Sequence, residues 1–87
     1  MADLKAVRKE IDGIDDQIAE LINQRMEIVK KVAEYKKQNN SGIVDKNREI
    51  EILNRVCAGE YEEALRGVFE AVFEESREYQ KIILSEK

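Results

Sequence analysis

Residues 4–36 read LKAVRKEIDGIDDQIAELINQRMEIVKKVAEYK, and this stretch decides the fold. Side chains recur in it every seven residues along two neighbouring columns. The first column is Leu4, Ile11, Ile18, Arg25 and Val32, and the second is Val7, Ile14, Leu21, Ile28 and Tyr35. Because neighbouring apolar columns at this spacing are typical of a helix that packs along a seam, the stretch predicts one long helix over 4–37. Asp3 is its expected N-cap.

The rest of the chain predicts two shorter helices. There is no proline, and the run Gln38-Asn39-Asn40-Ser41-Gly42 predicts a turn after the first helix. Asp45 is the expected N-cap of a second helix over about 46–57, which Gly59 ends, and a third helix is expected over about 60–84. We expect the second helix to bury Ile50, Leu53 and Val56. The third helix carries a single stripe made of Leu65, Val68, Phe69, Val72, Phe73, Ser76, Tyr79, Gln80 and Ile83. Since no linker or repeat divides the chain, residues 1–87 are expected to form one all-α domain.

The composition excludes several classes of function. The 15 Lys and Arg residues are scattered among 19 Asp and Glu, so the net charge is −4 and nucleic-acid binding is not expected. With no histidine, one cysteine and no glycine-rich phosphate loop, the sequence indicates no metal centre, activated nucleophile or cofactor site. Cys57 is expected to be a buried apolar residue in a reducing compartment. No segment has the hydrophobicity of a membrane span or a signal peptide, so we expect a soluble, cytoplasmic protein that binds no membrane.

Polar side chains interrupt the apolar stripes at a few positions. Arg25 stands within the first column of the long helix, and Arg8 and Lys36 flank the same seam. On the third helix Ser76 and Gln80, four residues apart, are neighbours on one face. Polar residues where the pattern asks for apolar ones are informative, because folding would bury them.

Each interruption also has an ordinary structural explanation. Arg25 can fix the register of packed helices by pairing with an acid, either Asp15 or Glu49. Lys36 can lie along apolar surface and keep its charge in water, and the two polar residues of the third helix can satisfy internal hydrogen bonds. Their convergence favours function instead, because several cations and neutral donors share faces that carry few acids. That combination indicates a pocket for a small anion.

Helix geometry separates the cations along the long helix. Arg25 and Lys36 are 11 residues apart, on nearly the same face and roughly 16 Å from each other, so they can bracket a ligand. Arg8 lies 17 residues before Arg25, roughly 25 Å away, and cannot reach the same small molecule. A helix of about 34 residues is also roughly 50 Å long, which exceeds a compact protomer of this size. We therefore expect an intertwined homodimer in which Arg8 serves the site of the partner subunit.

Four short sequence elements follow one another along the chain. They are an Arg in the first turns, an R-x(10)-K pair, D-x-x-R-E and S-x-x-x-Q, represented here by Arg8, Arg25 with Lys36, Asp45 with Arg48 and Glu49, and Ser76 with Gln80. With the segments IVDKNREIEIL and EESREYQ beside the long helix, the chain resembles the all-helical chorismate mutases over about residues 4–84.

The resemblance implies an isomerase that converts chorismate to prephenate, in the shikimate pathway to aromatic amino acids. The reaction is a pericyclic, Claisen-type rearrangement, and the resemblance implies no cofactor and no metal. Arg25, with Arg8 of the partner subunit, is implied to bind the two carboxylates of the substrate. Lys36 and Gln80 are implied to donate to the ether oxygen, and Glu49 to accept from the ring hydroxyl.

Three further residues are implied to bind substrate. Backbone near Asp45 would assist at the ring hydroxyl, Arg48 would support the carboxylate end, and Ser76 would hydrogen-bond a carboxylate. Two other functions stay open on sequence alone. Isochorismate-pyruvate lyases resemble the same family and use a similarly cationic pocket. A non-catalytic helical dimerisation module would use Arg25 only to set register, but it leaves the other polar residues unexplained.

Overall fold

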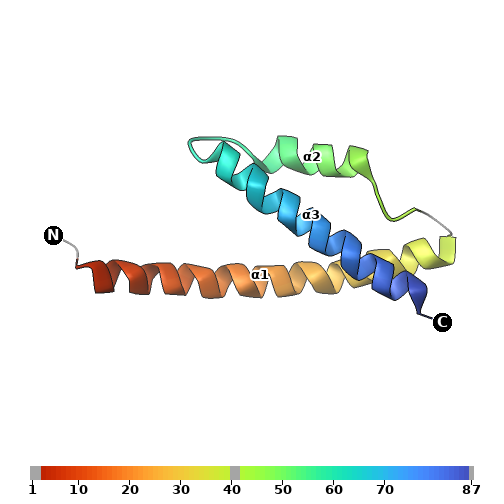
Figure 1. Cartoon of the computed structure of the whole chain (residues 1–87), viewed down its shortest axis with the longest axis horizontal. Coiled ribbons are helices and arrows are strands. Elements are labelled where there is room, and N and C mark those ends of the chain that lie inside the picture. The colour runs from red at the N-terminus through yellow and green to blue at the C-terminus, as the bar shows by residue number, and fades with distance from the viewer. Residues whose placement is uncertain (1–2, 40–41, 87) are drawn as a thin grey trace.

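The computed structural model describes residues 3–39 and 42–86, which form three helices and no strand. Helix α1 spans Leu4–Asn39, α2 spans Lys46–Val56 and α3 spans Glu62–Ser85 (Figure 1). The all-α prediction with a very long first helix is confirmed. The predicted ends differ by one or two residues, as is usual for frayed helix termini.

Local hydrogen bonds explain where the helices begin. Asp3 accepts a hydrogen bond from the backbone N–H of Lys5 at its Oδ1 atom, over 3.2 Å, and so caps α1. Asp45 does the same for α2, because its Oδ1 accepts from the backbone N–H of Arg48 over 3.0 Å. Both predicted N-caps are therefore confirmed. After α2 the chain turns at Gly59, whose φ of +89° lies in the left-handed region that favours glycine.

The helices are arranged so that half of α1 stands apart. Helix α3 lies across the C-terminal half of α1, and α2 packs on α3, while the N-terminal half of α1 projects beyond both (Figure 1). The described residues extend over 57 × 26 × 14 Å, and their radius of gyration is 16.4 Å. A compact chain of this length would have a radius of gyration of about 12 Å. The protomer is therefore elongated along α1.

The core between α2 and α3 is small. It consists of four buried residues, with three partly buried ones packed against them: Ile52, Leu53, Cys57 and Phe73, then Val56, Leu65 and Phe69. The predicted burial of Cys57 is confirmed. The predicted burial of Ile50 is wrong, because its side chain is 53% exposed.

The position of Ile50 has a physical reason. The inward stripe of α2 runs through Glu49, Ile52, Leu53 and Val56, which follow the spacing of one helix face. Glu49 takes an inward place on this stripe because it pairs with a cation on α3, over 2.6 Å. Ile50 is thereby turned to the outside.

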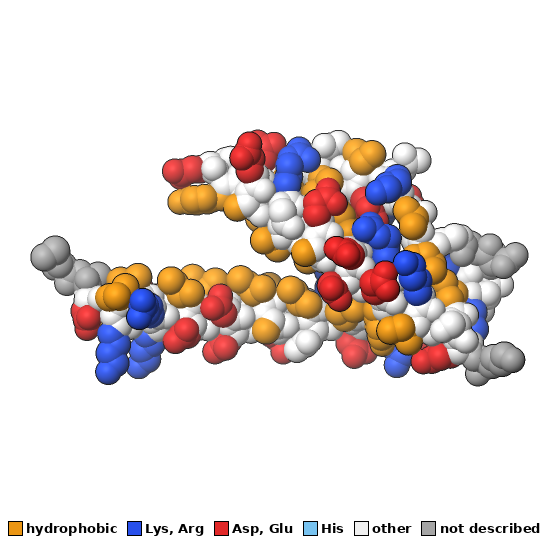
Figure 2. All heavy atoms as spheres, viewed as in Figure 1, with side chains coloured by type: hydrophobic (Ala, Val, Ile, Leu, Met, Phe, Trp, Pro, Cys, Tyr) orange, Lys and Arg blue, Asp and Glu red, His pale blue; other side chains and the backbone are white. Residues whose placement is uncertain are grey.

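The projecting half of α1 carries a continuous apolar face. Figure 2 shows these side chains along the edge of α1 that faces the open wedge below α2 and α3. Each is about half exposed or more, and the face includes Leu4, Ile11, Ile14, Ile18 and Leu21. An exposed apolar surface of this extent is typical of an interaction site. None of the helices in the described residues is long and apolar enough to cross a membrane.

Candidate functional site

A pocket of about 330 Å³ lies where the C-terminal half of α1 meets α2 and α3. Apolar side chains line much of it, including Ile28, Val29 and Val32 of α1, Ile52 of α2 and Phe73 of α3. The polar and charged side chains of its wall are Arg25, Lys36, Asp45, Arg48, Glu49, Ser76, Arg77 and Gln80. Seven of the eight predicted site residues are therefore brought together, although they come from three helices.

Arg25 reaches from α1 to α3. Its Nη1 atom donates a hydrogen bond to Ser76 Oγ over 2.7 Å, and Ser76 Oγ donates to the backbone carbonyl of Val72 over 2.7 Å. The guanidinium carbon lies 6.0 Å from the centre of the Phe73 ring, within cation–π range. Ser76 is buried, so this contact holds Arg25 at the pocket wall.

No carboxylate among residues 3–39 and 42–86 forms an ion pair with Arg25. The alternative in which Arg25 pairs with Asp15 or Glu49 is therefore wrong for the described protomer. Burial first, and the nearby charge of Arg48 second, lower the pKa of Arg25 below its ordinary value. Arg25 is thus a partly buried cation beside a second cation, an arrangement that a bound anion would relieve.

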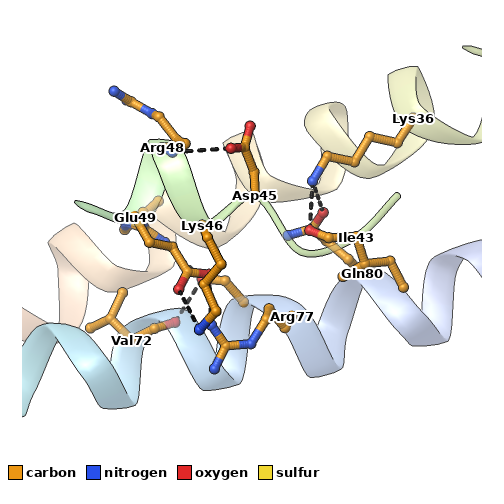
Figure 3. A network of polar contacts seen from close by, with 11 residues as sticks. Lys36, Ile43, Asp45, Lys46, Arg48, Glu49, Val72, Arg77 and Gln80 are labelled. Atoms are coloured by element: carbon orange, nitrogen blue, oxygen red, sulfur yellow. Dashed lines mark hydrogen bonds and ion pairs between the residues drawn. The ribbon is translucent and has the colours of Figure 1, made fainter. Parts of the chain in front are cut away.

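Lys36 connects α1 to the loop before α2 and to α3. Its Nζ atom donates to the backbone carbonyl of Ile43 and to Gln80 Oε1, each over 2.9 Å (Figure 3). An ammonium group has three N–H donors, so one remains for the pocket. Gln80 is buried, and because its Oε1 accepts from Lys36, its Nε2 is the donor that remains for a ligand.

Glu49 lies on the opposite wall and pairs with Arg77 of α3. Arg77 Nη1 donates to Glu49 Oε2 over 2.6 Å, and Lys46 Nζ is 4.0 Å from Glu49 Oε1 (Figure 3). The side chains of Glu49 and Arg77 are 14% and 23% exposed. The hydrogen bond with Glu49 is the largest cause that raises the pKa of Arg77.

Sequence reasoning missed Arg77. It follows Phe73 by four residues and precedes Gln80 by three, so it shares the face that identified Ser76 and Gln80. That spacing could have identified Arg77 from the sequence. Its partner could not have been identified in this way, because Glu49 is 28 residues away and on another helix.

Asp45 and Arg48 line the pocket without pointing their polar groups into it. Asp45 is occupied as the cap of α2. The guanidinium of Arg48 turns outward (Figure 3). It pairs there with Glu51, whose Oε1 is 2.5 Å from Arg48 Nη1, and the two side chains are 52% and 67% exposed. Arg48 therefore needs to change rotamer before it can contact a ligand in the pocket.

Arg8 is the predicted site residue that lies elsewhere. It is on the projecting half of α1, where its neighbours along a shallow depression are Asp3, Leu4, Lys5, Lys9 and Asp12. It does not line the pocket of its own protomer.

The charges of the pocket wall do not balance. Its lining includes four cationic side chains, Arg25, Lys36, Arg48 and Arg77, and two anionic ones, Asp45 and Glu49, which leaves a net charge of +2. Within the described part of the chain no group of three or more Asp, Glu, His or Cys side chains could hold a metal ion. A wall with this excess of cationic groups and N–H donors can bind an anion.

A family model described as chorismate mutase type II matches residues 7–81, nearly the whole chain. The chain belongs to the chorismate mutase type II family. Its residues are also 41% identical, over 56 residues, to a bifunctional chorismate mutase/prephenate dehydratase from Aquifex aeolicus (strain VF5). That alignment covers 64% of this chain and 16% of the Aquifex protein, so the chain spans a small part of that relative.

The fold is also similar to a solved structure. A conserved hypothetical protein from Pyrococcus furiosus superposes on this chain with a TM-score of 0.74 and 44% sequence identity. The superposition covers 88% of this chain and 93% of the Pyrococcus protein. The two proteins therefore share the fold over most of both chains.

Proposed function

We propose that this chain, as one domain over residues 1–87, catalyses the rearrangement of chorismate to prephenate. The observation that carries the proposal is the charge of the pocket. Arg25 is a partly buried cation without an acidic partner in the described residues, in a wall of net charge +2. Chorismate is a dicarboxylate, so its two negative charges match the charge that the pocket leaves uncompensated.

The chemistry fits the groups that the pocket supplies. In the rearrangement the ether C–O bond breaks while a C–C bond forms within the same molecule, and no external nucleophile or proton is needed. The protein has to hold the substrate in a compact, chair-like conformation and to stabilise negative charge that develops on the ether oxygen. Fixed N–H donors in a partly apolar pocket are suited to both tasks.

The carboxylates are assigned to the arginines. Arg25 binds one of them, assisted by the hydroxyl of Ser76, because the two side chains are already joined at 2.7 Å. The planar fork of an arginine suits bidentate binding of a carboxylate. Arg48 supports the carboxylate end after it leaves Glu51. The second carboxylate is bound by Arg8 of the partner subunit.

The ether oxygen is assigned to Lys36 and Gln80. The hydrogen bond between them leaves each with a donor for the same region of the pocket. Removing one donor of this kind typically lowers the rate by about 10²–10³. On the opposite wall Glu49 accepts from the ring hydroxyl, assisted by backbone near Asp45.

The proposed active unit is an intertwined homodimer. Its support is the apolar face of α1, which is about half exposed at Ile11, Ile14 and Ile18 and which the protomer does not cover. An antiparallel second copy would bury this face and bring Arg8 toward the pocket of the first. Burial of apolar surface contributes about 25 cal/mol per Å², so covering the face stabilises both chains.

The test is an assay with chorismate and isochorismate, offered side by side. Loss of the diene absorbance gives the rate, and product identification separates prephenate from the products of pyruvate elimination. We expect prephenate from chorismate, and a loss of about 10² or more in kcat/KM for Arg25→Ala. Absence of turnover in a folded chain, or pyruvate release from isochorismate as the faster reaction, would contradict the proposal.

A further inference from the structure

Arg77 lies in the pocket wall, yet its guanidinium is engaged with the protein. It donates from Nη1 to Glu49 Oε2 over 2.6 Å, and this ion pair is the one in the described residues that joins α2 to α3 (Figure 3). The other ion pairs of the described residues join positions three or four apart on one helix, and their side chains are mostly well exposed. The pair with Glu49 is thus distinguished by its burial and by its span.

Glu49 has competing partners. Its carboxylate borders a pocket that also contains Arg25 and Arg48, and an unrestrained carboxylate would move toward such cations. If Glu49 neutralised them, it would occupy the charges that bind substrate. The bond from Arg77 holds the carboxylate against α3 instead.

The same bond determines which oxygen of Glu49 is available. Oε2 accepts from Arg77, whereas the ion pair of Oε1 is with Lys46, at 4.0 Å and with a side chain that is 73% exposed. Oε1 therefore keeps its capacity to accept a hydrogen bond from a ligand. A carboxylate accepts several hydrogen bonds, so engagement of one oxygen does not prevent this.

We propose that Arg77 is a positioning residue that holds Glu49 in the orientation in which Oε1 accepts the ring hydroxyl of the substrate. This inference rests on the proposed function, because it assigns a task within that reaction. Arg77 does not touch the substrate in this scheme. It acts through Glu49, from the same face of α3 that carries Ser76 and Gln80.

Arginine suits the task better than lysine. Its guanidinium is planar and presents donors in a fixed fork, so it defines the direction of the carboxylate as well as its charge. The hydrogen bond with Glu49 is the largest cause that raises the pKa of Arg77, and the charges of Glu49, Glu74 and Glu70 raise it further, whereas burial lowers it. Arg77 thus stays cationic over the whole range in which the protein can be assayed.

The experiment is a kinetic double-mutant cycle on the full chain, with wild type, Arg77→Met, Glu49→Gln and the double variant. The ring hydroxyl gains no charge in the rearrangement, so its contact is made equally in the ground state and the transition state. Arg77→Met should therefore raise KM by about tenfold and leave kcat nearly unchanged. In the Glu49→Gln background the same change should alter KM by less than about twofold. Arg77→Lys should recover part of the loss.

A matched control is Arg66→Met, on the same helix, which removes an exposed pair with Glu62. It should leave KM and kcat within about twofold of wild type. Circular dichroism at the assay temperature gives the folded fraction of every variant. Partial unfolding lowers the amount of active protein, and hence kcat, without changing KM, so it is separable from the expected result.

Two results would overturn this role for Arg77 alone. One is a fall in kcat at constant KM, which would make the residue a structural tie. The other is an equal rise in KM in both backgrounds, which would mean that Arg77 contacts the substrate itself. A wild-type chain without turnover would instead overturn the proposed function, and this role with it.

Discussion

Gln80 accepts a hydrogen bond from Lys36 through its Oε1 atom, over 2.9 Å. The contact joins α3 to α1 across 44 positions of sequence and orients the amide so that Nε2 remains to donate. Since the same ammonium also holds the carbonyl of Ile43, the loop before α2 is tied to the two groups assigned to the ether oxygen. One ammonium group therefore fixes both the loop and the orientation of the Gln80 amide.

Gln80→Glu should make kcat/KM depend on pH, with the higher activity at acidic pH. A glutamate at this position is ionised near neutral pH, pairs with Lys36 as an acceptor and has no proton to donate to the ether oxygen. We expect kcat/KM to fall by about 10²–10³ at neutral pH and to recover as the pH falls. Wild type, whose amide donates at any pH, should have no acidic optimum. The measurement is kcat/KM from pH 4.5 to pH 8.

The control for this variant is Gln38→Glu, which introduces the same charge at an exposed position of α1. It should follow the wild-type pH profile. A pH-independent loss in Gln80→Glu would show that the carboxyl does not act by its protonation state.

Arg25→Met should lower kcat/KM by about 10² or more without loss of stability. Burial lowers the pKa of Arg25, so keeping this guanidinium charged in the folded protein costs stability. The cost is constant from about pH 5 to about pH 9, because an arginine stays protonated there. Methionine has a similar length and no charge to desolvate, so the free energy of unfolding should be unchanged or higher. The difference between variant and wild type should not vary with pH in that range.

Thermal unfolding with and without malonate, at low salt, provides the measurement. Malonate should raise the Tm of wild type, because an anion that binds only the folded chain stabilises it. Arg25→Met should show a smaller shift. A variant that unfolds at a lower Tm in buffer would contradict the assignment of Arg25 to the ligand, and would favour a role in packing.

Mixed subunits should regain activity if the site is shared. Arg8→Ala and Arg25→Ala chains, each inactive alone, form a heterodimer in which one of the two sites has both arginines. With equal amounts and random exchange, about a quarter of the wild-type rate is expected. The measurement is the rate after partial unfolding and refolding of the mixture, with exchange verified by mass spectrometry of the intact dimer. No recovery despite exchange would exclude a shared site.

Glu51→Gln should tighten substrate binding. In the protomer Glu51 holds the guanidinium of Arg48 on the outside of α2. The carboxylate of Glu51 therefore competes with the carboxylate of the substrate for Arg48. An exposed pair of this kind contributes about 0.2–1 kcal/mol, which corresponds to a decrease in KM of up to about fivefold. The matched control is Glu78→Gln, which removes an equivalent exposed pair with Lys81 on α3. A rise in KM for Glu51→Gln would indicate that Arg48 acts from its outward position.

Local patterns predicted much of the fold. The length of α1 followed from a repeat that persists over nine turns, and the caps at Asp3 and Asp45 followed from side chains that bond within three residues. Ile50 was misplaced because periodicity alone treats an acid as an outer residue. Glu49 faces inward because its cation is on another helix, and such a partner is not visible in a local window.

The candidate site was also predicted from local patterns, and the prediction again missed a contact between two helices. Seven residues that interrupt apolar faces or belong to the family elements do line one pocket. Arg77 was missed because a charged residue on an acidic helix is ordinarily a solvated one. The outward rotamer of Arg48 depends on a competition with Glu51 that composition does not reveal. The dimer, with Arg8 crossing to the partner, stays a prediction.

The projecting half of α1 has a consequence for inheritance. It carries Arg8, whereas the other half of the same helix lines the pocket with Arg25 and Lys36. In the proposed dimer, a chain defective at both arginines damages its own site and the site of any normal chain that it joins. A cell that makes both chains equally would keep only the dimers of two normal chains, about a quarter of the total. Such an allele would leave less activity than one that makes no chain at all, which would leave about half.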